Sequence, residues 1–116
     1  MKEYSLQINL IKYIESKNLK NLRFFHVPNQ GARTPRQKIF LYNLGLRSGC
    51  PDLVLEFKNG KIVYIELKTK KGTLFSSQKA WLEKSNQLKT PHYILKGELE
   101  SLKKQLDDIL LKHYKI

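Results

Sequence analysis

Residues 49–71 read GCPDLVLEFKNGKIVYIELKTKK, two alternating apolar runs on either side of an Asn-Gly pair. This pattern predicts a β-hairpin with strands near Asp52–Phe57 and Ile62–Thr69. Successive side chains of a strand alternate between its faces, so Glu66 and Lys68 share one face of the second strand and its apolar residues take the other. A carboxylate beside an ammonium at the end of an apolar strand suggests a functional site.

The length of the hairpin loop decides whether Asp52 joins these two residues. A two-residue loop at the Asn-Gly pair would turn Asp52 away from Glu66. A three-residue loop at 58–60 places Asp52 opposite Glu66, and Gly60 suits the left-handed residue that ends such loops. We therefore predict the three-residue loop, which brings Asp52, Glu66 and Lys68 to one face.

Two carboxylates beside a lysine suit metal-assisted hydrolysis of phosphodiester bonds. Mg²⁺ and Mn²⁺ take oxygen ligands, commonly one or two carboxylates together with water and substrate phosphate. The ion polarises the phosphoryl oxygen and lowers the pKa of a bound water. Asp52 and Glu66 are the predicted metal ligands, with the backbone carbonyl of Leu67 as a further candidate. Lys68 is the predicted catalytic lysine, serving the water or the transition state; the alternative is a surface Glu–Lys pair on an edge hairpin.

The formal net charge of +12, with a sequence pI near 9.9, predicts a polyanionic partner, most often nucleic acid. A solubilising lysine coat is the alternative.

A chain of 116 residues has the size of one domain, which we expect to span residues 1–116. The single Cys50 excludes an internal disulfide and fits a reducing compartment, so we expect a cytoplasmic protein, or a viral protein acting in the host cytoplasm. Neither a membrane-spanning run nor a signal-peptide pattern is found, so no membrane association is expected.

Outside the hairpin, apolar spacing and turn residues predict four helices and two short strands. The helices are expected at 3–17, at about 35–44, at about 76–88 and at 99–110, and the strands at 23–27 and 92–95. Residues 28–31 are typical of a turn. The order of elements predicts an α/β domain whose central mixed sheet of four strands is flanked by helices.

Four blocks of the sequence, in order, resemble one branch of the PD-(D/E)XK nucleases, the VRR-NUC (virus-type replication-repair nuclease) domain. They are Pro28–Arg33, Gly45–Leu53, Ile65–Lys68 followed by Gly72, and Gln78–Leu82. The resemblance implies a restriction-endonuclease-like core and a Mg²⁺- or Mn²⁺-dependent DNA endonuclease. It also implies a homodimer acting on branched or Holliday-junction DNA, with a role in DNA repair. A non-catalytic DNA-binding module with a nuclease-like fold is the alternative, and a relative of archaeal junction resolvases would differ in lineage more than in chemistry.

The resemblance adds Glu3 as a further metal ligand and Gln78 as a side chain pointing at the active site. The alternatives are that Glu3 stabilises the helix dipole and that Gln78 caps its helix or is exposed. Phe75 departs from the family, which usually has Ser or Thr near that place; we expect Ser76 or Ser77 to cap the helix. The expected phosphate contacts, with surface solvation as the alternative, are Arg33, Arg36, Arg47, Lys70 and Lys71.

Overall fold

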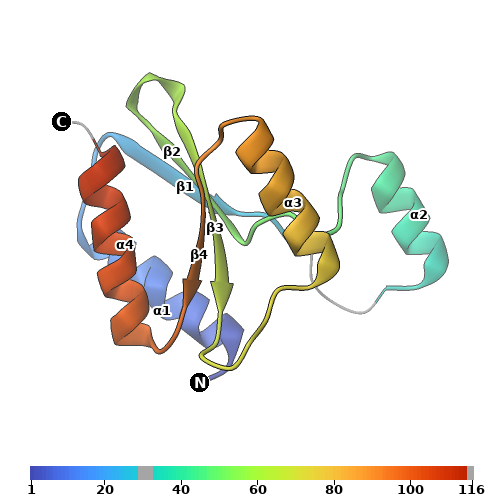
Figure 1. The fold of residues 1–116 in the computed structure, drawn as a ribbon, viewed down its shortest axis with the longest axis horizontal. Helices are drawn as coiled ribbons and strands as arrows, with labels where there is room; N and C mark the ends of the chain where they lie inside the picture. Colours follow the sequence, from blue (N-terminus) through green and yellow to red (C-terminus); the bar gives the residue numbers. More distant parts are fainter. Residues whose placement is uncertain (29–32, 115–116) are drawn as a thin grey trace.

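A computed structural model describes residues 1–28 and 33–114 of the chain (Figure 1). Its elements are α1 (Glu3–Ser16), β1 (Leu22–His26), α2 (Pro35–Asn43), β2 (Leu53–Phe57), a 3-10 turn (Lys58–Gly60), β3 (Ile62–Lys68), α3 (Ser76–Gln87), β4 (His92–Lys96) and α4 (Leu99–His113). This order of helices and strands is the predicted one. The predicted turn at 28–31 falls mostly on residues 29–32, which lie outside the described residues. Within the described part of the chain, no helix is both long and apolar enough to cross a membrane.

The four strands form a mixed sheet in the order β1-β2-β3-β4. β2 pairs antiparallel with both β1 and β3, whereas β3 and β4 are parallel. A parallel pair needs a crossover connection, and α3 supplies it between β3 and β4. The predicted α/β fold, a central mixed four-stranded sheet flanked by helices, is confirmed.

The hairpin of β2 and β3 has the three-residue loop that the sequence predicts. The Phe57 N–H donates to the Lys61 carbonyl across this loop at 2.7 Å. Gly60, the last loop residue, has the left-handed conformation expected of it, with φ of 75°. Continued to the other end of the hairpin, the observed register sets Asp52 opposite Glu66.

The two faces of β3 have different surroundings. One face carries fully buried apolar residues that pack against α1 and α4, which also contact each other. These residues are Val63, Ile65 and Leu67 of β3, together with Leu6 and Leu10 of α1 and Leu102 and Leu106 of α4. The main hydrophobic core therefore lies on the face opposite to Glu66 and Lys68.

Helix α3 covers the other face more loosely. The ring of Trp81 meets the ring of Tyr64 edge-on, with 6.4 Å between centroids, and the hydroxyl of Ser85 lies 3.0 Å from Nδ1 of His92. Ser85 is the one buried residue among those described in α3. This face keeps room for a site because few side chains of α3 fill it.

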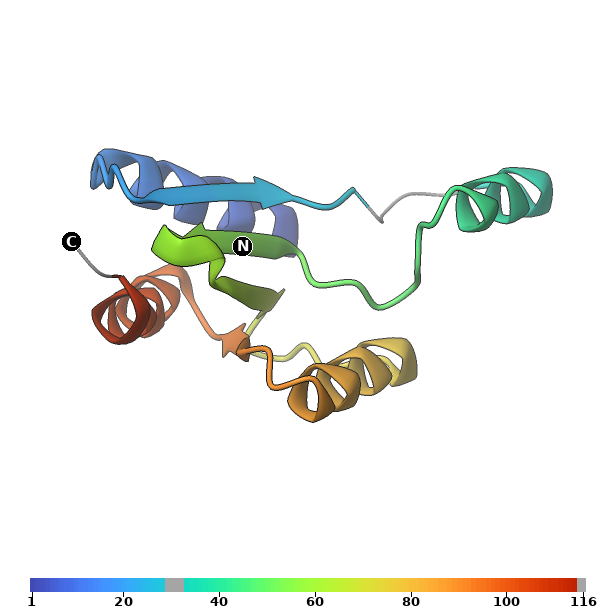
Figure 2. The same cartoon turned by 90° about the horizontal axis from the view of Figure 1, so that it is seen from above.

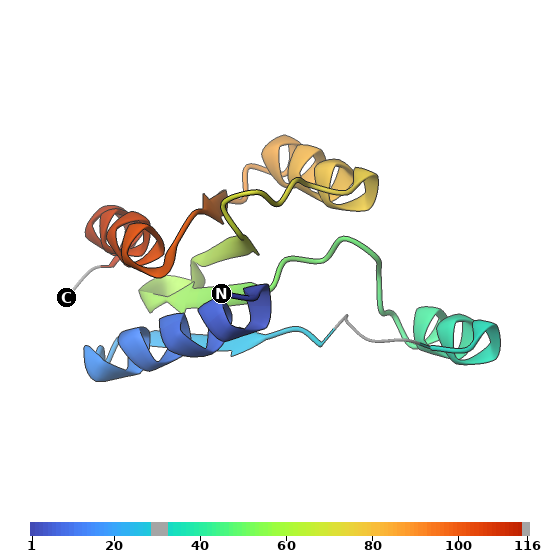
Figure 3. The same cartoon turned by 90° about the horizontal axis from the view of Figure 1, so that it is seen from below.

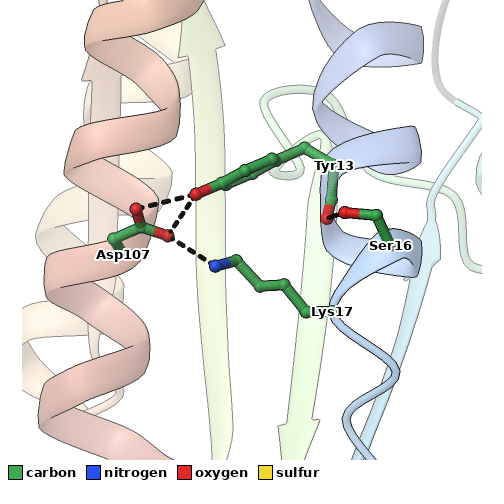
Figure 4. A network of polar contacts seen from close by, with 4 residues as sticks. All are labelled: Tyr13, Ser16, Lys17 and Asp107. Carbon is green, nitrogen blue, oxygen red and sulfur yellow. Dashed lines mark hydrogen bonds and ion pairs between the residues drawn. The ribbon is translucent and has the colours of Figure 1, made fainter.

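A polar contact closes the seam between α1 and α4 (Figure 4). The Tyr13 hydroxyl lies 2.7 and 2.8 Å from the two carboxylate oxygens of Asp107, to which it donates. The Lys17 ammonium pairs with the same carboxylate at 3.0 Å and lies 4.5 Å from the centroid of the Tyr13 ring. These contacts hold the two core-covering helices together, so the sheet is supported from the face that lacks the site.

Helix α2 stands apart from the sheet and the other helices (Figures 2 and 3). Its start is well capped, because the Thr34 hydroxyl accepts from the Gln37 N–H at 3.1 Å and the Gln37 side chain accepts from the Thr34 N–H at 2.9 Å. None of its described residues is buried. Four large apolar side chains on α2 or just beyond its end are 58–69% exposed, whereas that of Leu41 is half-buried: Ile39, Phe40, Tyr42 and Leu44. Except for the Arg47 guanidinium over the Tyr42 ring, the described part of the chain leaves these four side chains largely uncovered.

Candidate active site

The hairpin brings Asp52, Glu66 and Lys68 together at one end of the sheet. These three residues are 6%, 2% and 4% exposed, respectively. Oδ2 of Asp52 accepts a hydrogen bond from the backbone N–H of Leu67 at 2.7 Å. The Asp52 carboxylate is thereby anchored to the strand segment between Glu66 and Lys68.

The backbone carbonyl of Leu67 faces the same place. In a β-strand the N–H and C=O of one residue point to the same side, and the N–H of Leu67 points at Asp52. The carbonyl of Lys68 points the other way, where it accepts from the Gly97 N–H at 3.2 Å. The Leu67 carbonyl is therefore directed toward the Asp52 side, as a ligand at this site requires.

Glu66 has the least favourable environment for a charged carboxylate. Burial, followed by the hydrogen bond and the negative charge of Asp52, raises its pKa to about 9, against the opposing charge of Lys68. Its Oε2 atom is buried without a hydrogen-bond partner among the residues that the structure describes. A buried acceptor left unpaired costs roughly 1–3 kcal/mol. A divalent cation would compensate for both effects, so the two carboxylates fit an ion such as Mg²⁺ or Mn²⁺.

Glu3 lies in the first turn of α1, at the margin of this site. Burial raises its pKa, the charge of Asp52 raises it further, and Lys68 lowers it. Among the described residues, however, no three His, Cys, Asp or Glu side chains converge into a group that could hold a metal. The structure thus places Glu3 beside the carboxylate pair without forming a three-ligand cluster.

A cavity of about 480 Å³ opens at the site between the end of β3 and the start of α3. Its lining residues are Glu3, Ser48, Gly49, Lys68, Phe75, Ser77 and Gln78. The side-chain oxygen of Gln78 accepts a hydrogen bond from the Phe75 N–H at 2.9 Å. Gln78 therefore has two roles: its side chain accepts a hydrogen bond at the start of α3, and it also lines the cavity. The expected cap at Ser76 or Ser77 is wrong, because the N-cap residue is Phe75.

Gly49 allows the loop before β2 to lie directly on the start of α3. It has φ of 83°, and a Cβ there would lie 2.2 Å from the Ser77 carbonyl oxygen and 3.0 Å from the Gln78 nitrogen. A side chain at this position would collide with backbone, which cannot yield as a flexible side chain does. The loop that leads to Asp52 and the helix that carries Gln78 are consequently held in fixed contact.

His26 supports the site from β1, a role that the sequence did not reveal. Its Nδ1 atom lies 2.8 Å from the Asp52 carbonyl oxygen and 3.0 Å from the side-chain nitrogen of Gln7 in α1. The Val27 N–H donates to the same carbonyl at 3.3 Å. The His26 ring and the Val27 N–H therefore both hold the backbone carbonyl of Asp52. The sequence predicts that His26 lies in a strand. It does not show that this strand pairs with β2, and the contact with Asp52 can be inferred only from that pairing.

Two of the five expected phosphate-binding residues, Arg33 and Arg47, line a second cavity of about 460 Å³ against α2. Its other lining residues are Lys38, Ile39, Leu41, Tyr42, Leu46 and Ser48, and Ser48 also lines the first cavity. The Arg47 guanidinium lies 3.9 Å from the centroid of the Tyr42 ring and donates to the Tyr42 carbonyl at 2.8 Å, so part of its role is structural. A basic surface thus adjoins the carboxylate site.

The other three expected contacts lie elsewhere. Arg36 is exposed in the first turn of α2. Lys70 and Lys71 line a third cavity with Glu98 and Glu100. Because β3 ends at Lys68, Lys70 lies beyond the strand, and the alternation of strand side chains does not place it on the face of the site.

Comparisons with known proteins agree with this fold. The family model of the VRR-NUC domain matches residues 1–99. Among solved structures, one described as a VRR_NUC domain superimposes with a TM-score of 0.60 at 18% sequence identity, covering 97% of each chain. A comparison with curated proteins gives no match.

Glu66→Gln is expected to stabilise the metal-free protein, because wild-type Glu66 must take up a proton to be buried in the folded state and the amide need not. The folded protein keeps the Glu66 proton up to about pH 9, whereas the carboxyl ordinarily loses it near 4.5. Glu66 therefore costs the folded state least at low pH, and its cost grows as the pH rises toward 9. In chelator at about pH 8 we expect the variant to have a higher free energy of unfolding than the wild type by urea denaturation.

This gain is expected to shrink as the pH falls toward about 4.5, where wild-type Glu66 is neutral in both states. Glu83→Gln, at an exposed position of α3, is the matched control and should unfold like the wild type. A Glu66→Gln variant that is no more stable than the wild type at about pH 8 would contradict the described environment of this carboxyl.

Proposed function

The chain belongs to the VRR-NUC domain family, a family of nuclease domains, and we propose that it is an endonuclease that hydrolyses DNA phosphodiester bonds with Mg²⁺ or Mn²⁺. The observation that supports this most is the buried carboxylate pair, Asp52 with Glu66, beside a buried Lys68. Burying two carboxylates together is costly to folding, and such arrangements are concentrated at functional sites. A pure DNA-binding module needs no buried carboxylates next to a phosphate, so the enzyme is the better explanation.

The residues of the site divide the chemistry between them. A cation at the carboxylates would supply Lewis-acid activation of the phosphoryl group and of a water molecule. Asp52 and Glu66 hold it, with the Leu67 carbonyl directed to the same place. Lys68 places a positive charge where negative charge develops on the phosphate, or orients the attacking water. The N–H of Leu67 and the contact from His26 hold Asp52 in place, so little rearrangement is needed on binding.

The charge distribution favours DNA as the substrate. The net charge of +12 is accompanied by the basic cavity of Arg33, Lys38 and Arg47, which adjoins the site at Ser48. Such residues contact phosphates, which give affinity and register without reading bases. The proposed enzyme therefore selects its substrate by structure more than by sequence, with branched or Holliday-junction DNA as the proposed form. Arg36, Lys70 and Lys71 are proposed to extend these backbone contacts.

The open apolar side of α2 supports a homodimer. A helix of nine residues is too short to be stable by itself in water, and this one buries none of its described residues against the rest of the chain. Phe40 and Leu44, four residues apart, are 61% and 69% exposed and lie outside the cavity of Arg33 and Arg47, so they present an apolar surface of the kind that marks an interface. A second copy of the chain is the proposed partner, because two subunits would place two sites on opposing strands of a branched DNA.

Lys68→Ala is expected to abolish cleavage while leaving the fold intact. Removal of one charge that stabilises the transition state typically costs about 100- to 1000-fold in rate. The assay is cleavage of labelled four-way junction, flap and linear duplex DNA in Mg²⁺, in Mn²⁺ and in chelator. Lys104→Ala, an exposed lysine of α4, is the matched control and should cleave like the wild type.

Cleavage that needs the cation and disappears in Lys68→Ala would support the enzyme and rank its substrates. Tight, salt-dependent binding without cleavage in either cation would reject the enzyme and favour a DNA-binding module instead.

Phe40→Glu is expected to convert a dimer into a monomer, because a carboxylate would be buried without a partner in the apolar interface. Sedimentation velocity measures the change. Leu111→Glu is the matched control, since Leu111 is 82% exposed on α4, away from α2, and should leave the mass unchanged. A wild-type protein that sediments as a monomer at all concentrations would contradict the proposed dimer.

A further inference from the structure

Phe75 is an aromatic residue that contributes little to the fold. It is the N-cap residue of α3, a position where Ser, Thr, Asp or Asn stabilises a helix by accepting a backbone hydrogen bond. A phenyl ring cannot do this. The residue is also 68% exposed, so its ring is hardly used to fill the core. A residue that neither caps its helix nor packs in the interior invites a functional explanation.

The ring lies at the mouth of the catalytic cavity. Phe75 lines that cavity together with Lys68, whose ammonium nitrogen is 4.6 Å from the centroid of the ring. The backbone of Phe75 is held by the hydrogen bond to the Gln78 side chain. The close approach of Gly49 to Ser77 fixes the same end of α3. The ring thus has a defined place next to the lysine that is proposed to act on the phosphate.

We propose that Phe75 is a specificity-determining residue that stacks on an unpaired nucleobase next to the bond being cut. An exposed aromatic ring beside a phosphate site is the usual platform for single-stranded nucleic acid, because every base has an aromatic face. Lys68 lies over one face of the ring, and the large exposed fraction of the residue leaves surface for a base. A base inside a duplex is already stacked on both sides and cannot reach the ring.

The inference rests on the proposed nuclease function and narrows its substrate. The favoured substrates have an unpaired nucleotide at the cut: single strands, flaps, or junctions with unpaired bases at the branch point. Continuous duplex would lack the stacking contact and be cut more slowly.

Phe75→Ser and Phe75→Trp test this inference. Serine restores a capping hydroxyl, so this variant should have a melting temperature no lower than that of the wild type while lacking the ring. Tryptophan keeps an aromatic face. Binding is measured in Ca²⁺, which takes oxygen ligands as Mg²⁺ does, with oligonucleotides that carry one 2-aminopurine whose fluorescence is quenched by stacking.

We expect Phe75→Ser to bind single-stranded oligonucleotides roughly 5- to 100-fold more weakly and to lose the quench, while its binding to duplex falls by much less. Phe75→Trp should retain both the affinity and the quench. In the cleavage assay, Phe75→Ser should lose more activity on unpaired than on duplex substrate, so that the preference for unpaired DNA disappears.

Two outcomes of the binding measurement, and one of the cleavage assay, would overturn the inference. Unchanged single-strand binding and quench in Phe75→Ser would show that no base stacks there. An equal loss on paired and unpaired substrates would show that the ring serves only to hold Lys68. If the wild type cuts no substrate, the proposed function fails, yet the binding measurement still decides whether a base stacks on Phe75. If the wild type cuts and Phe75→Ser keeps its selectivity, the inference alone fails.

Discussion

The hydrogen bond from the Leu67 N–H to the Asp52 carboxylate is the contact on which the site depends. It exists because the three-residue loop sets the register of β2 against β3. A shift of that register by one residue would turn Asp52 to the other face of the sheet, into the apolar core. The same register leaves Glu66 directly opposite Asp52 and directs the Leu67 carbonyl to the same side. One local feature, the loop that ends in Gly60, thus determines the geometry of the proposed metal site.

The two faces of the sheet have different roles: one packs against helices and stabilises the fold, and the other carries the candidate site. On one face, fully buried apolar residues pack against α1 and α4, which the Tyr13–Asp107 contact ties together. On the other face, a carboxyl whose pKa is raised to about 9 lies beside a second carboxylate, and α3 packs loosely over them. The apolar face supplies the stability that offsets the cost of the polar one. The proposed nuclease site can therefore be unfavourable in the absence of a cation without unfolding the chain.

Local patterns in the sequence predicted the order of elements, the mixed sheet and the hairpin loop, because alternation and an Asn-Gly pair act within a few residues of one another. Contacts between distant segments were harder to predict. The partner of His26 is a backbone carbonyl on the neighbouring strand, which no side-chain pattern marks. The cap of α3 was misplaced because the helix begins one residue after Phe75, whose N–H donates to the Gln78 side chain from inside the first turn. Apolar spacing identified α2 as a helix, yet spacing says nothing about whether the rest of the chain covers its apolar side.

The measurement that tests the central claim most directly is calorimetric titration of Mn²⁺ into the metal-free protein. If Asp52 and Glu66 hold one ion between them, the wild type binds about one Mn²⁺ per protein chain. Asp52→Asn and Glu66→Gln should each bind it at least about tenfold more weakly, while Glu83→Gln binds like the wild type. Equal binding by the wild type and both site variants would contradict the account, because the buried carboxylates would then have no part in holding the metal.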